Sequence, residues 1–182
     1  MQTITLVTGN AHKIAEYKRL LPADFPFEVR DLDLIEIQSF DSIEIIADKA
    51  QRAYDIIGGP VMVEDVSAGL DSLNGLPGPF IKFFNQQLGH DSLYKIAKDD
   101  KRTTVTCTIG YYDGSRLLLA SGAVKGAVVP LRGDGGFGFD GVFVPKGHAK
   151  TYAQMTDAEK DALSHRALAV KDLLAQLLPK SD

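Results

Sequence analysis

The apolar positions near the N-terminus indicate a strand followed by a helix. Residues 4–7 form a short apolar-rich run typical of a strand, and Ile14 and Tyr17 recur at helical spacing within residues 11–21. Asn10, which precedes this segment, is a favoured helix N-cap. We therefore expect a strand, a short glycine-containing turn and a capped helix. The N–H groups and dipole at such a helix start suit an anion such as phosphate.

A second helix is predicted over residues 41–57, after an extended segment at residues 27–37. Asp41 or Ser42 is available as its N-cap, and glycines 58 and 59 followed by a proline are available as its stop. The helical face that we expect to be buried comprises Ile43, Ile46, Ala47, Ala50, Tyr54 and Ile57.

A short buried strand is predicted next, over residues 61–64. It would bring Glu64 and Asp65 to its carboxyl end, just before a loop over residues 66–79 that is rich in glycine and proline. Ligands of α/β sheets bind at the carboxyl ends of strands. Two carboxylates at this position, joined by Glu36 from the earlier extended segment, are therefore candidates to hold a hard cation beside substrate phosphates.

The second half of the chain predicts helical pieces, a hairpin and a helical tail. The helical pieces cover residues 80–88 and 91–98, and the hairpin pairs residues 103–112 with 116–129 through Asp113-Gly114. An extended run is expected at residues 142–144. Helical periodicity begins at Thr156, which forms a capping box with Glu159, and Ser164 is available to open a second helix.

Length and composition bound the function. A chain of 182 residues fits one compact domain or two closely fused lobes, and 45% hydrophobic residues are enough for a core. The net charge of −4 argues against sequence-independent binding to nucleic acid or to an anionic membrane. The single Cys107 rules out an intrachain disulfide, and no apolar run approaches a membrane span. We expect a cytoplasmic protein.

Four groups of residues are candidates for chemistry. The segment Thr8 to Lys13 lacks a Walker-type loop but combines a hydroxyl, a glycine, a helix start and a lysine, which together suit a polyphosphate. An ordinary strand-to-helix turn is the alternative. The carboxylates Glu36, Glu64 and Asp65 either hold a metal or face solvent.

The third group is the glycine-rich run at residues 135–141, in which Phe137 and Phe139 either stack on a nucleobase or belong to the core. The fourth is Ser164-His165-Arg166, which is either a solvent-facing helical stretch or a polar helix start beside a ligand. Adjacent Ser and His without a GxSxG motif disfavour serine hydrolysis.

In combination these segments resemble the inosine triphosphate pyrophosphatase family. The landmarks stand in family order over nearly the whole chain: TGNAHK, IEIQ, GPVMVEDV, LNGLPGPFIKFF, GFGFDGVFVP and TYAQMTDAEKDALSHR. Val66 interrupts the DDSGL pattern of many bacterial members, and Phe139 stands where other members carry tyrosine or tryptophan. The resemblance implies hydrolysis of the non-standard purine nucleoside triphosphates ITP, dITP and XTP to the monophosphate and pyrophosphate.

The resemblance also implies roles for individual residues. Glu36 and Asp65 would bind Mg²⁺, with Mn²⁺ as an alternative, and Asp65 would also be the general base. Lys13 would stabilise phosphate charge and, with Asp65, make up the catalytic pair. The substrate-binding positions would be Thr8, Gly9, Asn10, Ala11, His12, Lys13, Lys49, Val66, Phe137, Gly138, Phe139, Asp140, Lys160, His165 and Arg166.

For the architecture we expect an α/β fold in which residues 1–182 form one domain. A long, twisted, mixed central sheet would be flanked by helices, with two lobes around a nucleotide-binding cleft. The resemblance implies a homodimer. Two other functions remain open: a Maf-type nucleotide pyrophosphatase with a different base preference, and a nucleotide sensor without turnover.

Overall fold

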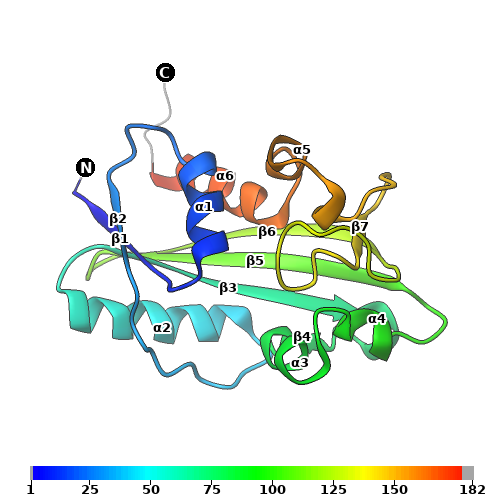
Figure 1. The fold of residues 1–182 in the computed structure, drawn as a ribbon. Coiled ribbons are helices and arrows are strands. Elements are labelled where there is room, and N and C mark those ends of the chain that lie inside the picture. The colour runs from blue at the N-terminus through cyan, green and yellow to red at the C-terminus, as the bar shows by residue number, and fades with distance from the viewer. Residues whose placement is uncertain (1, 178–182) are drawn as a thin grey trace. The chain divides into compact units, whose positions relative to one another are not determined.

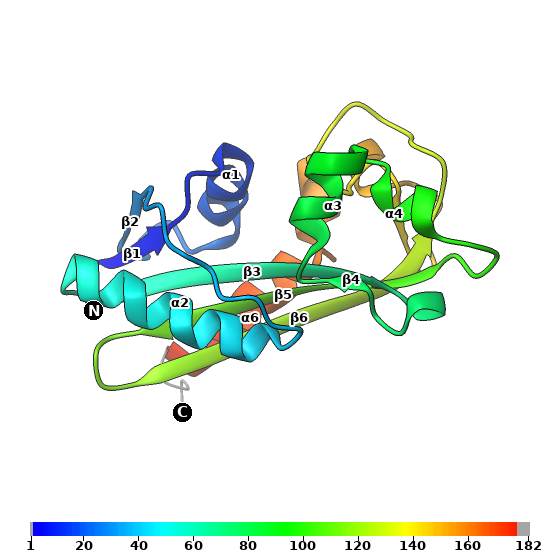
Figure 2. The same ribbon diagram turned by 90° about the horizontal axis from the view of Figure 1, so that it is seen from below.

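The computed structural model of the protein describes residues 2–177 as a mixed α/β fold (Figures 1 and 2). Its seven-stranded sheet has the order β2-β1-β3-β5-β6-β7, and β4 pairs with β3 outside this path. The strands are β1 (Ile4–Val7), β2 (Phe27–Arg30), β3 (Val61–Leu70), β4 (Pro77–Gly78), β5 (Arg102–Tyr112), β6 (Leu117–Val128) and β7 (Phe143–Pro145). The helices are α1 (Ala11–Leu20), α2 (Ser42–Ile57), α3 (Ile81–Leu88), α4 (Ser92–Ile96), α5 (Asp157–Asp161) and α6 (His165–Leu177), with short 3-10 turns at Asp71–Leu73 and Tyr152–Gln154. The predicted mixed sheet with flanking helices is confirmed.

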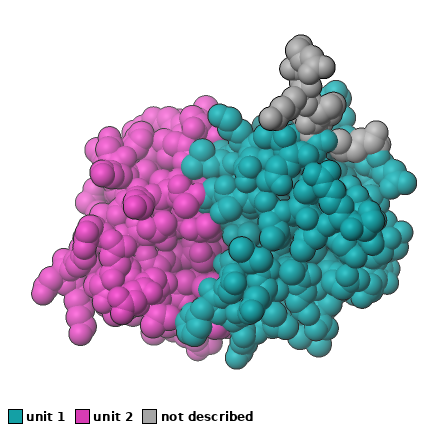
Figure 3. Space-filling model, turned by 180° about the vertical axis from the view of Figure 1, so that it is seen from behind, with its two compact units in different colours: residues 1–65, 107–122, 166–182 teal, residues 66–106, 123–165 magenta. Residues whose placement is uncertain are grey.

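The chain forms two compact units, each built from separate segments (Figure 3). Unit 1 comprises residues 1–65, 107–122 and 166–182, and unit 2 comprises residues 66–106 and 123–165. The expected single domain and the cleft between two lobes stay predictions. None of the helices within residues 2–177 has the length and apolar character needed to span a bilayer.

Unit 1 is built on parallel strands with helices on both faces. β1 pairs in parallel with β2, Ile4 opposite Phe27, and with β3, Thr5 opposite Val61. Figures 1 and 2 show α2 on one face of this part of the sheet and α6 on the other. The face under α2 is closed by a cluster of small and branched apolar side chains: Val7, Ile46, Ala50, Ala53, Val61 and Val63.

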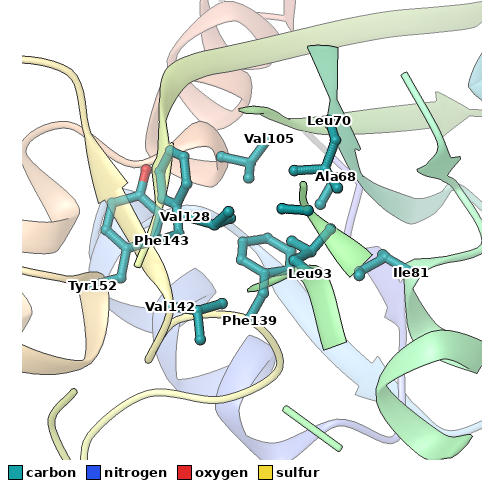
Figure 4. Packing of buried hydrophobic residues seen from close by; sticks show 11 residues of the cluster. Ala68, Leu70, Ile81, Leu93, Val105, Val128, Phe139, Val142, Phe143 and Tyr152 are labelled. Atoms are coloured by element: carbon teal, nitrogen blue, oxygen red, sulfur yellow. The ribbon is translucent and has the colours of Figure 1, made fainter. Parts of the chain in front are cut away.

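Unit 2 is held by a core of aliphatic side chains and three aromatic rings (Figure 4). Phe143 of β7 packs edge-on against Phe139 and Tyr152, at 6.3 and 4.9 Å between ring centroids. β7 pairs antiparallel with β6, Val128 opposite Phe143. The buried members of this cluster are Ala68, Leu70, Ile81, Leu93, Ala97, Val105, Val128, Phe139, Val142, Phe143 and Tyr152.

The predicted helix signals are confirmed at most ends. Asn10 caps α1, Asp41 rather than Ser42 caps α2, and Gly58 ends α2 with a left-handed φ of 72°. The buried face of α2 was predicted in part wrongly, because Ile43 is 53% exposed whereas Ile45 is buried. Ala53 is also fully buried, although the predicted face did not include it. Ile43 lies in the first turn of the helix, where the covering cluster has no member.

Two predicted strands have different lengths in the structure. β2 ends at Arg30, so residues 31–41 contain no regular strand, because β2 lies at the edge of the sheet where only one neighbour fixes it. β3 continues to Leu70, so Glu64 and Asp65 lie in mid-strand and not at its end. The small residues after Asp65 looked like a loop, yet β4 pairs with them, with Ala68 opposite Gly78. The tail is two helices, and α6 begins directly after Ser164.

Candidate active site

The turn between β1 and α1 is built around a helix cap. The Asn10 Oδ1 atom accepts hydrogen bonds from the backbone N–H groups of His12 (3.0 Å) and Lys13 (3.2 Å), and Thr8 Oγ1 accepts one from Asn10 N–H at 3.2 Å. A Cβ atom on Gly9 would lie 2.5 Å from the Asp31 carboxylate, so a larger residue there would require the Asp31 side chain to move. Because the cap uses two of the first N–H groups, the helix dipole and the Lys13 side chain carry most of the attraction for an anion.

Glu64 is the centre of a cluster of buried charges in unit 1. Lys13 Nζ lies 2.7 Å from Glu64 Oε1, and Arg166 donates Nη2 to Oε1 at 2.8 Å and Nε to Oε2 at 2.9 Å. The third guanidinium nitrogen of Arg166 forms an ion pair with Glu16. Tyr17 OH donates to Glu64 Oε2 at 2.8 Å. Two cations thus face two carboxylates, and three of these four charged side chains are less than a tenth exposed, whereas that of Lys13 is 22% exposed.

The charges of this cluster stabilise one another. Burial raises the pKa of Glu64, but Arg166 and Lys13 outweigh burial and hold it well below the usual value. Burial lowers the pKa of Arg166, but Glu64 more than compensates and raises it well above the usual value. Burial and the negative charge of Glu64 together raise the pKa of Tyr17 and of Cys107 well above their usual values. Both therefore remain protonated, and the Cys107 thiol lies 3.7 Å from Glu64 Oε2.

Asp65 lies beside a second, more accessible group of charges in unit 1. Its Oδ2 atom accepts a hydrogen bond from Ser42 Oγ at 3.1 Å. Lys49 of α2 forms an ion pair with Glu36 and donates to the Glu64 backbone carbonyl at 3.2 Å. Burial raises the pKa of Asp65, and the negative charge of Glu36 adds to that increase. The structure therefore brings Glu36, Lys49 and Asp65 close enough to interact, while their roles toward metal and substrate stay predictions.

These two carboxylates fit the donor chemistry of a hard cation. Asp65 and Glu36 supply oxygen ligands, and the repulsion that Asp65 feels from Glu36 is what a divalent cation would relieve. Within residues 2–177, no group of three or more His, Cys, Asp or Glu side chains is gathered as a metal site. Mg²⁺ in phosphate chemistry is usually held by one or two carboxylates, with substrate phosphates and water as its other ligands.

Unit 2 contains a buried ion pair between two of the predicted residues. Lys160 Nζ lies 2.7 Å from Asp140 Oδ2, which also accepts the Phe137 backbone N–H at 2.8 Å. A Cβ atom on Gly136 would lie 2.3 Å from that same oxygen, and φ at Gly136 is 71°, so the turn requires glycine. Lys160 Nζ also lies 5.2 Å from the centre of the Phe137 ring, a cation–π contact.

The two phenylalanines of the glycine-rich run have different surroundings. Phe139 is 5% exposed and belongs to the core of unit 2, whereas Phe137 is half-buried. His165 stacks on Tyr152 at 5.9 Å between centroids and lies 5.8 Å from Phe139. Residues 137–141 form turns and not a strand, so the rings do not alternate across a sheet. Of the two, Phe137 is the one with ring surface left for a ligand.

Sequence reasoning missed two buried side chains of the Glu64 cluster, Glu16 and Tyr17. Both lie on α1 one turn after Lys13, at the i+3 and i+4 positions that share a helical face with it. That spacing was the available signal, but nothing in the sequence connected this face to Glu64. Val66, predicted to contact substrate, packs its side chain against the core of unit 2.

Comparison with known proteins assigns the chain to a family. Residues 4–176 match the Ham1 family, which is nearly the whole chain. The chain belongs to the Ham1 family. A protein of Schizosaccharomyces pombe named inosine triphosphate pyrophosphatase is 44% identical over 177 residues, covering 95% of this chain and 94% of its own. The Trypanosoma cruzi protein named inosine triphosphate pyrophosphatase 2 is 43% identical over 177 residues, with coverage of 94% and 90%.

Solved structures of the Ham1 family share the fold. The structure of a HAM1 protein from Coxiella burnetii has a TM-score of 0.80 and 26% identity, and it covers 97% of this chain and 98% of its own. The Ham1 protein of Staphylococcus aureus has a TM-score of 0.75 and 25% identity, with coverage of 97% and 98%. The family resemblance seen in the sequence is confirmed.

Proposed function

We propose that this chain hydrolyses the non-standard purine nucleoside triphosphates ITP, dITP and XTP to the monophosphate and pyrophosphate. The observation that carries the proposal is 44% identity, over 95% of the chain, to a protein named inosine triphosphate pyrophosphatase. The residues of both units support it, because unit 1 gathers cations and carboxylates and unit 2 gathers rings around one ion pair.

The residues of unit 1 are assigned to the triphosphate. Lys13 and Lys49 carry the positive charge for the phosphate oxygens, and the start of α1 adds its dipole. Glu36 and Asp65 would hold Mg²⁺, or Mn²⁺ in its place, which when bound supplies charge neutralisation and a more acidic water. Asp65 is the general base that accepts a proton from the attacking water.

The residues of unit 2 are assigned to the base. The exposed part of the Phe137 ring stacks on the purine, and the Lys160–Asp140 pair fixes the turn that carries this ring. His165 or a backbone N–H donates to the 6-oxo group, and an adenine amino group would place a donor against that donor. Arg166 is engaged with Glu64 and Glu16, so its role is to hold Glu64.

Two further features of the proposal come from the family resemblance and have their own tests. We propose a homodimer, for which light scattering would give twice the 19.7 kDa of one chain. We also propose a cytoplasmic location, which a fluorescent fusion in cells would check.

The decisive experiment measures pyrophosphate release from ITP, dITP, XTP, GTP, ATP and dTTP, with Mg²⁺ and with chelator, and identifies the nucleotide product. We expect Mg²⁺-dependent conversion of ITP or XTP to the monophosphate, with GTP and ATP largely spared. Orthophosphate and a diphosphate product would place the cut at the outer bond and contradict the mechanism. Preference for a modified pyrimidine would favour the Maf-type reaction, and absence of turnover would favour a sensor.

A further inference from the structure

Two side chains of α1 reach the same carboxylate of unit 1. Lys13 and Tyr17 are four residues apart, so they lie on one face of the helix. Lys13 Nζ lies 2.7 Å from Glu64 Oε1, and Tyr17 OH donates to Glu64 Oε2 at 2.8 Å. The Glu64 carboxylate thus faces α1 with both oxygens, one toward the ammonium and the other toward the phenol.

The supports of Glu64 come from different elements and do different things. Arg166 binds both oxygens and ties the carboxylate to α6. Tyr17 ties it to α1, the helix that carries Lys13. Arg166 also binds Glu16 of α1, so it links the Glu64 carboxylate to α1 through a second carboxylate. Tyr17 links Glu64 to α1 directly, and Lys13 and Tyr17 move together on this one helix.

The phenol also suits the charge balance of the cluster. Lys13 and Arg166 already balance Glu16 and Glu64, so another cation would leave an uncompensated charge in the interior. A tyrosine adds a donor without adding charge. Its side chain is fully buried, so packing holds its ring and hydroxyl in one place.

We propose that Tyr17 is a positioning residue for pyrophosphate release: its hydroxyl fixes Glu64, and Glu64 in turn fixes the ammonium group of Lys13. This inference rests on the proposed function, in which Lys13 stabilises charge on the triphosphate. In this proposal Tyr17 does not contact the substrate. It acts through Glu64 on the Lys13 ammonium group, which does.

The test is a cycle of Tyr17→Phe and Lys13→Ala, each alone and together, with kcat and KM measured on ITP and Mg²⁺. A hydrogen bond to a charged group has an energy that corresponds to about a tenfold change in rate, so Tyr17→Phe should lower kcat about tenfold. We expect its KM to change less than about twofold. In the Lys13→Ala background Tyr17→Phe should cause no further loss, because the group it positions is gone.

Tyr112→Phe is the matched control. Tyr112 also lies in unit 1 and also donates its hydroxyl to an oxygen, the Gly114 carbonyl at 3.2 Å, but it has no role in the proposed reaction. We expect its kcat to equal that of the wild type. Thermal melts of all variants show whether each one folds.

The outcomes separate the inference from the proposed function. If the wild type converts ITP and Tyr17→Phe keeps its kcat, only the inference is overturned. Equal losses with and without Lys13, or a Tyr17→Phe protein that does not fold, would show that the hydroxyl serves the structure and would overturn it too. A folded wild type without turnover on any triphosphate would overturn the proposed function, and the inference with it.

Discussion

The two units bury charge in opposite ways. In unit 1, Glu64 accepts hydrogen bonds or ion pairs from Lys13, Arg166 and Tyr17, and Glu16 forms an ion pair with the same Arg166. In unit 2, one ion pair between Lys160 and Asp140 lies among aromatic rings. The first arrangement joins several charged side chains through shared partners, and the second centres on a buried ion pair beside aromatic rings.

In the proposed function, unit 1 would serve the triphosphate of a nucleotide and unit 2 the base. A triphosphate carries several negative charges, so its binding residues must supply positive charge that is already fixed in position. Under the proposal Lys13 would meet this need, because its partly exposed ammonium group is paired with Glu64. A purine base is flat and mostly apolar, so a ring such as Phe137 and a few fixed polar groups suffice. Substitutions in either unit test whether the two kinds of buried charge differ in this way.

The largest expected effect is on catalysis in unit 1. Asp65→Asn keeps the size of the side chain but removes the proton acceptor, so turnover of ITP should fall by about 100- to 10,000-fold. The melting temperature should remain close to that of the wild type. Asp48→Asn is the matched control, because Asp48 lies on α2 in an exposed pair with Arg52 and should keep full activity. An active Asp65→Asn enzyme would contradict both the base role and the metal role of Asp65.

The next prediction concerns how much the buried charges of each unit contribute to the free energy of unfolding. Arg166→Met removes the guanidinium that Glu64 and Glu16 share, and breaking a buried ion network of this kind destabilises by about 3–5 kcal/mol. Lys160→Met leaves Asp140 with the Phe137 N–H and should cost about 2–3 kcal/mol. Urea denaturation measures both differences.

An exposed pair supplies the control for this comparison. Arg52→Met removes a surface pair with Asp48 and should change the free energy of unfolding by about 0.5 kcal/mol or less. If Lys160→Met lowered the free energy of unfolding more than Arg166→Met did, the ion pair of unit 2 would stabilise the protein more than the Glu64 cluster of unit 1. That result would contradict the expected order.

Local signals in the sequence predicted much of the fold. Helix caps at Asn10 and Asp41, the Gly58 stop and the Asp113-Gly114 hairpin depend on a few neighbouring residues, and all are confirmed. The length of β3 was wrong because it depends on a distant partner: Ala68 and Gly69 remain in a strand since β4 pairs with them. Pairing of this kind leaves no local mark in the sequence.

The candidate site could also be predicted only in part, because some of its contacts join distant parts of the chain. Glu36 and Asp65 were expected together as carboxylates, and the structure places their charges close enough to interact, with Lys49 paired to Glu36. The central place of Glu64 was not foreseen, because it depends on Arg166, which is 102 residues away in the chain. Composition identified Phe137 and Phe139 as a pair, but only the packing of the core shows that Phe139 is buried in it.

A smaller effect tests the base end in unit 2. Phe137→Ala removes the half-exposed ring, and loss of one stacking contact should weaken ITP binding by about 1–3 kcal/mol, a rise in Kd of roughly 5- to 150-fold. Calorimetry with the Asp65→Asn protein measures Kd without turnover. Phe83→Ala is the control, because Phe83 is 50% exposed on α3, and it should bind ITP as the unsubstituted protein does. An unchanged Kd for Phe137→Ala would show that this ring does not stack on the base.

The smallest expected effect concerns the weakest donor to Glu64. The Cys107 thiol lies 3.7 Å from Glu64 Oε2, and a thiol is a poor donor beside the phenol of Tyr17 and the guanidinium of Arg166. Cys107→Ala should therefore change kcat less than about twofold and destabilise by about 1 kcal/mol through lost packing. Because burial and Glu64 raise the pKa of the thiol, native protein should also resist alkylation. A kcat loss as large as that of Tyr17→Phe would mean that any disturbance near Glu64 slows the reaction. The place of Tyr17 on α1 would then give it no special role.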